Sequence, residues 1–139
     1  MGADVGDFEE VATIPCDSPP GITTLAVPIN QDQAILDLFL QSLAATEASG
    51  CHVIFVVDGG CTATVDALVG WTAALSSKAT AAKIFVNRHP KGWGRCISFA
   101  MEMCKSEFLV TLDSDLVLIP GWLDQLIAVA TARANVGAV

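Results

Sequence analysis

Two aspartates separated by one residue, Asp113 and Asp115, are the side chains in this sequence best suited to hold a divalent cation. At about 5 Å apart and an effective dielectric constant of about 20, two carboxylates repel each other by roughly 3 kcal/mol. A bound cation removes that repulsion, and Mg²⁺ and Mn²⁺ favour one or two carboxylates together with phosphate oxygens and water. The pair therefore predicts a site for Mn²⁺ or Mg²⁺ that a phosphorylated ligand completes.

Other polar residues of this apolar chain follow runs rich in β-branched residues. Asn30, Asp58 and Asp113 each come directly after such a run, and Lys91 comes shortly after another. Ligands of parallel sheets collect outside the carboxyl ends of the strands. We therefore expect these side chains to meet at one polar edge of a sheet.

The elements that must position these residues alternate along the chain. Runs with apolar side chains on successive residues predict strands covered on both faces, and apolar residues at helical spacing predict helices between them. The alternation predicts an α/β, Rossmann-like fold with a mostly parallel sheet, right-handed crossovers and helices on both faces. The predicted strands cover residues 24–29, 52–57, 83–86 and 108–112, and the predicted helices cover residues 35–43, 65–75, 97–104 and 122–134.

The length of the chain fits one domain. Of its 139 residues, 53% are hydrophobic, which is enough apolar material for a buried core. Residues 1–21 are acidic, contain few apolar side chains and end in a Pro-Pro-Gly turn, so we expect them to form a flexible leader. The folded domain is predicted to cover residues 22–139.

The charge of the chain disfavours nucleic acid as a partner. There are 15 acidic and 7 basic residues, for a formal net charge of −8, whereas a nucleic acid needs Lys and Arg to displace its counterions. All seven basic residues lie within residues 78–139, so an anionic ligand should bind in that half.

Lys91 and Arg95 flank Gly92-Trp93-Gly94 at the start of a predicted helix, where backbone N–H groups and the helix dipole favour an anion. One interpretation places these two cations on the phosphates or ribose of a ligand, and the other leaves them in solvent. Trp93, between two glycines, is interpreted as a packing residue.

Cysteine usage and hydropathy favour a cytoplasmic protein. The five cysteines include no CxxC pair, so neither a disulfide framework nor a zinc site is indicated. No stretch approaches the roughly 20 apolar residues that cross a bilayer, and the acidic N-terminus is unlike a signal peptide. We expect no membrane segment in this chain.

In their order along the chain, these features resemble the family 2 glycosyltransferases of GT-A fold. The resemblance covers about residues 23–139. It rests on Val-Val-Asp-Gly-Gly at 56–60, Asn-x-x-x-x-Gly-x-Gly at 87–94, and Phe-Leu-Val-Thr-Leu-Asp-Ser-Asp at 108–115 followed by Pro-Gly-Trp-Leu at 120–123.

The resemblance implies that this chain is the nucleotide-sugar-binding half of a hexosyltransferase. Asp113 and Asp115 match the DxD motif that bridges Mn²⁺ or Mg²⁺ to the donor's diphosphate, and Asp58 matches the acid that hydrogen-bonds the donor's base, usually uracil. The implied reaction transfers a sugar with inversion from a nucleoside diphosphate sugar, such as a UDP-sugar, to an unknown acceptor (glycan, lipid or protein). The donor contacts expected from the strand ends and the resemblance together are Asn30, Asp58, Lys91, Arg95 and Asp113.

Three positions depart from the family pattern and leave the donor's identity open. Gly59 stands where the family often has a second acid, Ser98 stands where it commonly has Asn, and Asn30 ends the first strand one residue early. In the family, the acceptor pocket and the catalytic base follow the DxD half, so we expect the base beyond Val139. Residues 136–139 are interpreted as the start of a further strand of a truncated domain. General-base help is worth about 10²–10⁴-fold in rate, so this chain is expected to bind donor better than it transfers sugar.

Two alternatives remain open. Residues 112–117 also fit the motif of haloacid-dehalogenase-like phosphatases, in which Asp113 would attack phosphorus and Asp115 would act as general acid. That interpretation leaves Asp58 and the glycine-rich loop without a role. The other alternative is a non-catalytic module that binds nucleotide sugars.

Overall fold

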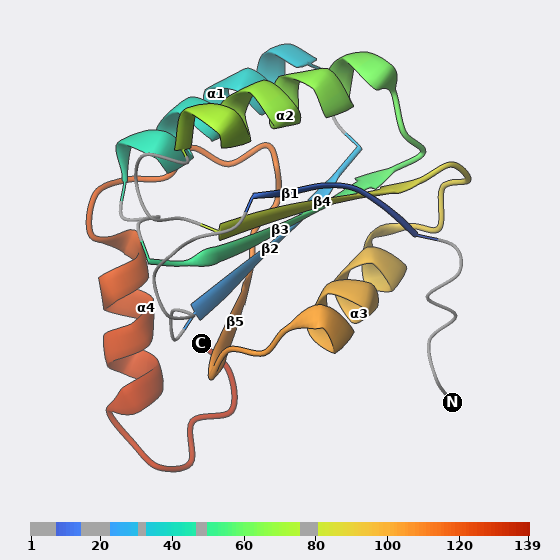
Figure 1. The fold of residues 1–139 in the computed structure, drawn as a ribbon. Coiled ribbons are helices and arrows are strands. Elements are labelled where there is room, and N and C mark those ends of the chain that lie inside the picture. Colours follow the sequence, from blue (N-terminus) through green and yellow to red (C-terminus); the bar gives the residue numbers. More distant parts are fainter. Residues whose placement is uncertain (1–7, 15–22, 31–32, 47–49, 76–80) are drawn as a thin grey trace.

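The computed structural model describes residues 8–14, 23–30, 33–46, 50–75 and 81–139. These residues form a five-stranded sheet covered by helices (Figure 1). In chain order the elements are β1 (Glu9–Ile14), β2 (Thr23–Ile29), α1 (Gln33–Ala45), β3 (His52–Asp58), α2 (Thr62–Leu75), β4 (Ala81–Asn87), α3 (Trp93–Met103), β5 (Phe108–Thr111) and α4 (Trp122–Thr131).

Four of the strands are parallel, as the alternation of elements predicts. The strand order is β1-β4-β3-β2-β5, and β2 pairs in parallel with both β3 and β5. All seven residues of β2 are buried, because this strand has neighbours on both sides and helices over both faces. The order places the ends of β2, β3 and β5 next to one another, which positions the candidate site.

Helices cover both faces of the sheet. α1 and α2 lie together on one face, and α3 lies on the other (Figure 1). The core under α1 and α2 includes Phe39, Phe55 and Leu68, and Leu123 of α4 belongs to the same core. On the opposite face Phe99 of α3 packs over the sheet. The predicted arrangement of helices on both faces is confirmed.

The strand β1 corrects the expectation of a flexible leader over residues 1–21. Glu9–Ile14 pairs antiparallel with β4 at the edge of the sheet. Phe8 is buried, and its ring stacks on Phe99 with 4.2 Å between the centroids. Residues 1–7 and 15–22, including the Pro-Pro-Gly turn, lie outside the described residues. Residues 8–14 are ordered because one aromatic side chain, Phe8, reaches the core, a contact that composition alone does not reveal.

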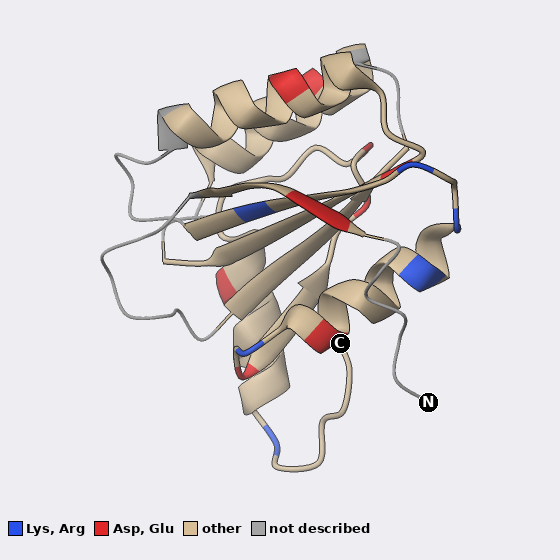
Figure 2. Cartoon of the chain, turned by 45° about the vertical axis from the view of Figure 1, so that its right-hand side comes forward, with Lys and Arg blue, Asp and Glu red and all other residues tan. Residues whose placement is uncertain are grey.

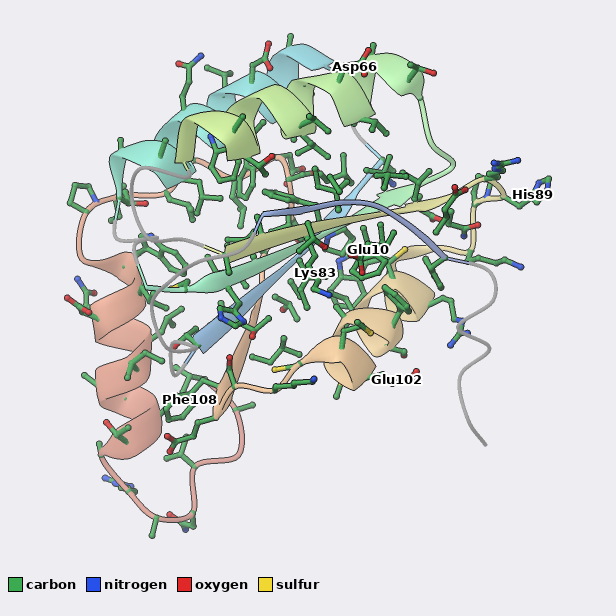
Figure 3. The ribbon with its side chains drawn as sticks, viewed as in Figure 1. Glu10, Asp66, Lys83, His89, Glu102 and Phe108 are labelled. Atoms are coloured by element: carbon green, nitrogen blue, oxygen red, sulfur yellow. The ribbon has the colours of Figure 1, made fainter. Side chains whose placement is uncertain are left out.

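Two ion pairs also join this strand to the rest of the sheet. Lys83 lies 3.3 Å from Glu10, and Arg88 lies 3.2 Å from Glu9. Figure 3 shows Lys83 and Glu10 side by side on the sheet. Pairs this exposed contribute at most about 1 kcal/mol each. They show that two of the cations expected to attract a ligand instead face the acidic strand.

The C-terminal segment also differs from expectation. α4 ends at Thr131, and residues 136–139 have no regular secondary structure, whereas the sequence pattern indicated a further strand there. These residues lie beside β5, in the lining of an apolar cavity of about 340 Å³. Among the helices described, none is long and apolar enough to cross a membrane.

Candidate functional site

The carboxyl ends of β2, β3 and β5 surround one polar cavity of about 160 Å³. Asn30 follows β2, Asp58 ends β3, and Asp113 and Asp115 follow β5. The structure thus brings together four of the residues that the sequence singled out. The lining consists of Pro28, Ile29, Asn30, Asp58, Trp93, Cys96, Asp113, Ser114 and Asp115.

The larger cavity beside β5 lacks the groups that chemistry requires. The described residues of its lining come from β5, Leu112, α4 and residues 136–139, and none of them is Asp, Glu, His, Cys, Lys or Arg. The smaller cavity contains three carboxylates and a thiol. Chemistry on a polar ligand is therefore expected at the smaller cavity.

The two aspartates of the DxD pair lie in a turn that follows β5. The backbone N–H of Leu112 still donates to Ala26 on β2 at 2.9 Å, and the N–H of Leu116 then closes a turn onto the carbonyl of Asp113 at 3.3 Å. Ser114 is buried, whereas Asp113 and Asp115 are exposed on either side of it. Both aspartates line the same cavity.

Asp58 links the end of β3 to the loop before α3. One carboxylate oxygen accepts the backbone N–H of Lys91 at 2.8 Å and the side-chain amide of Asn87 at 3.2 Å. The other oxygen accepts the backbone N–H of Gly92 at 2.8 Å. The Cys96 thiol also hydrogen-bonds this carboxylate, so the capacity of an ionised carboxylate for about four hydrogen bonds is used within the fold.

Asn87, at the end of β4, hydrogen-bonds Asp58 and the turns next to it. It is buried, its side-chain oxygen accepts the N–H of His89 at 3.0 Å, and its backbone carbonyl accepts the N–H groups of Gly59 and Gly60 at 2.8 and 3.1 Å. Gly59 has φ +83°, a conformation that side chains other than glycine rarely adopt. The glycine found in place of a second acid therefore suits a tight turn. The sequence indicates Asn87 as a polar residue after a strand and as the first residue of the motif at 87–94, but it does not show these contacts.

Trp93, interpreted from the sequence as a packing residue, instead lines the cavity. Its side chain is 54% exposed, and its indole N–H donates to Oδ1 of Asp113 at 2.9 Å. The contact joins α3 to the turn after β5. No local pattern predicts it, because the two residues meet only when the sheet is assembled.

Cys96 is a second lining residue that sequence reasoning missed. It is fully buried on α3, and burial together with the negative charge of Asp58 raises the pKa of its thiol to about 12. The group is thus a protonated thiol at neutral pH, which suits a packing role in the cavity wall.

Lys91 and Arg95 do not line the cavity. The contact of Lys91 with Asp58 is made by its backbone N–H, and the Arg95 guanidinium lies 5.8 Å from the centre of the Phe8 ring. Figure 2 shows basic residues on β4, on the loop after it and on α3, with acidic residues on β1. Neither Lys91 nor Arg95 is therefore among the described residues that line the site.

The donor atoms of the cavity fit a divalent cation that shares its ligands with a phosphate. Among the described residues, no group of three His, Cys, Asp or Glu side chains could hold a metal by itself. Mg²⁺ and Mn²⁺ need only one or two protein carboxylates when phosphate oxygens and water complete the shell. Asp113 and Asp115 supply two hard oxygen donors in an open cavity.

Comparisons with known proteins agree with the fold and the motifs. A family model described as Glycosyl transferase family 2 matches residues 24–139. A solved structure, the mannosyltransferase PcManGT from Pyrobaculum calidifontis in complex with GDP-Man and Mn²⁺, superposes with a TM-score of 0.74 at 17% sequence identity. The match covers 88% of this chain and 37% of the solved chain, so this chain spans well under half the length of that protein. No significant match was found among the curated proteins. The expected GT-A fold is confirmed.

Proposed function

The chain belongs to glycosyl transferase family 2, and on that premise we propose that it is the donor-binding part of a glycosyltransferase. In this proposal Asp113 and Asp115 hold a divalent cation against the diphosphate of a nucleoside diphosphate sugar. Membership of the family sets aside the phosphatase interpretation of the same two aspartates.

The observation that carries this proposal is the charge of the cavity. Asp58, Asp113 and Asp115 contribute three carboxylates, and none of the described lining residues is Lys or Arg. A diphosphate entering this cavity alone would meet only negative side chains, and at a few ångströms each such contact is unfavourable by about 1 to 4 kcal/mol. A cation between Asp113, Asp115 and the phosphates offsets these repulsions, because it attracts both the carboxylates and the phosphates.

The remaining residues have supporting roles in the proposal. Asp58, which the family resemblance assigns to the donor's base, also holds the loop before α3. Asn30 offers an amide at the cavity rim. Because Lys91 and Arg95 do not line the cavity, we place any contact from them on the outer part of the donor, at the ribose or beyond.

The chemistry assigned to this chain is binding and orientation of the donor. A bound Mn²⁺ or Mg²⁺ would supply charge stabilisation at the departing diphosphate. We assign no residue of this chain as the general base. We propose inversion at the anomeric carbon on family resemblance alone, and we assign no acceptor.

Calorimetric titration with UDP and with GDP, in Mn²⁺ and in EDTA, tests the proposal. The mannosyltransferase with the similar fold binds GDP-Man, so both nucleotides are needed to identify the base. We expect binding in Mn²⁺ and none in EDTA, and we expect Asp113→Ala and Asp115→Ala to weaken it by at least about tenfold. Asp66→Ala is the matched control, because Asp66 is exposed on the outer side of α2, away from the cavity (Figure 3). Equal binding with and without metal, or no binding of either nucleotide, contradicts the proposal.

A further inference from the structure

Trp93 connects the glycine-rich loop to the DxD turn. Its indole N–H is the only hydrogen-bond donor of the side chain, and it points to Oδ1 of Asp113 at 2.9 Å. The side chain is 54% exposed, so its position is not imposed by a surrounding core. The contact joins the first residue of α3 to the turn that follows β5.

The backbone before Trp93 is held by a second carboxylate of the same cavity. The N–H groups of Lys91 and Gly92 both donate to Asp58, each at 2.8 Å. Gly92 has φ +87°, and its carbonyl accepts the N–H of Cys96 at 3.2 Å as the first bond of α3. The backbone directly before Trp93 is therefore held in place by Asp58, and this fixes where α3 begins and where the Trp93 ring lies.

We propose that Trp93 is a positioning residue for the metal-binding carboxylate of Asp113. The indole N–H occupies one lone pair of Oδ1 and leaves Oδ2 and the other lone pairs for the cation. Hydrogen-bond partners behind a metal ligand fix its orientation, and their loss costs typically 10–100-fold in metal affinity. This inference rests on the proposed function, since it concerns how the same site holds its metal.

The hydrogen bond also has a role before metal binds. Asp113 and Asp115 are carboxylates that share one cavity with Asp58. A donor aimed at Asp113 offsets part of the repulsion among these charges and keeps the carboxylate turned into the cavity. The site is thereby prepared for the cation, which lowers the reorganisation that binding requires.

Substitution of Trp93 by Phe removes the N–H and keeps an aromatic ring. The chain offers a matched control, because Trp71 also donates its indole N–H, to the carbonyl of Leu40 at 3.0 Å, but lies outside the cavity lining. The affinity for Mn²⁺ would be measured for the parent, Trp93→Phe and Trp71→Phe in a saturating concentration of UDP or GDP, whichever the parent binds more tightly. We expect Trp93→Phe to bind Mn²⁺ about tenfold more weakly, at the lower end of the range for such partners because the site is exposed, and Trp71→Phe to match the parent.

A second measurement leaves Trp93 in place. In the double variant Trp71→Phe with Trp122→Phe, Trp93 is the sole tryptophan. Paramagnetic Mn²⁺ bound beside Asp113 should quench its fluorescence strongly, whereas Mg²⁺ should not. Equal or tighter Mn²⁺ binding by Trp93→Phe, or equal quenching by the two ions, overturns the role of Trp93 and leaves the proposed function standing. Failure of the parent to bind either UDP or GDP with Mn²⁺ contradicts the proposed function itself.

Discussion

The Asp58 carboxylate, at the end of β3, accepts the backbone N–H of Gly92 at 2.8 Å, although the two residues are 34 positions apart in the chain. The family resemblance assigns this acid to the base of the donor. The structure adds that the same acid holds the loop that carries Trp93 into the cavity. Loss of this carboxylate should therefore affect the fold and the binding of donor together.

Asp58→Asn is expected to lower the free energy of unfolding by about 2 to 3 kcal/mol, because hydrogen bonds to a charged group are worth about 1.5 to 3 kcal/mol and the new amide would face a backbone N–H. Urea denaturation followed by circular dichroism measures the change. Asp66→Asn, an exposed substitution on α2, is the control and should match the parent. If Asp58→Asn and the parent have the same urea midpoint of unfolding, the loop is held by other contacts.

Gly60→Ala tests the tightness of the turn after β3. A Cβ at this position would lie 2.4 Å from Cγ1 of Val86, and a β-branched side chain has few rotamers with which to give way. We expect a loss of about 1 to 3 kcal/mol in stability. Gly70→Ala provides the opposite case, since nothing lies within 4 Å of a Cβ there and the residue is inside α2.

Gly70→Ala should accordingly raise stability by about 0.5 to 1 kcal/mol, because alanine loses less backbone entropy in a helix. The two variants can be compared in one thermal or urea series. Unchanged or raised stability of Gly60→Ala would mean that the close approach of Gly60 to Val86 is not maintained in solution.

Phe8→Ala tests whether the N-terminal strand belongs to the domain. Phe8 is 7% exposed and stacks on Phe99, so we expect a loss of about 3 kcal/mol, as for other buried phenylalanines. Val11→Ala on the same strand is the control, because Val11 is 41% exposed and should cost much less. Equal stability of Phe8→Ala and the parent would return this segment to the flexible leader expected from composition.

The cysteines should differ in their reaction with iodoacetamide between pH 7 and 9, because the thiolate is the reactive form. The backbone N–H groups of Thr64 and then Ala63 lower the pKa of exposed Cys61, whereas burial raises that of Cys51 to about 11 and that of Cys96 to about 12. A lowered pKa means more thiolate at each pH below it, so Cys61 should be labelled before Cys51 and Cys96.

Peptide mapping by mass spectrometry identifies the labelled cysteine. Cys16, which lies outside the described residues, is best replaced by Ser in the protein used. Labelling of Cys96 as fast as Cys61 would mean that the wall of the cavity opens on the time scale of the reaction.

The parallel sheet could be predicted because its signals are local. Strands covered on both faces need apolar side chains on successive residues, and the runs at β2, β3, β4 and β5 meet that need. Asn30, Asp58, Asp113 and Asp115 were identified for a related reason, since polar residues directly after such runs must lie at the carboxyl edge of the sheet. Their placement around one cavity follows from the strand order.

Tertiary structure alone decided which of these groups contact one another. The bond from Trp93 to Asp113, the loop held by Asp58 and the stacking of Phe8 on Phe99 join residues far apart in the chain. Such contacts depend on which strand lies next to which and on where each helix begins, and neither is written in local periodicity. The sequence by itself thus determined the elements and the charged residues at their ends, whereas the assembled sheet decided which side chains hold those charges in place.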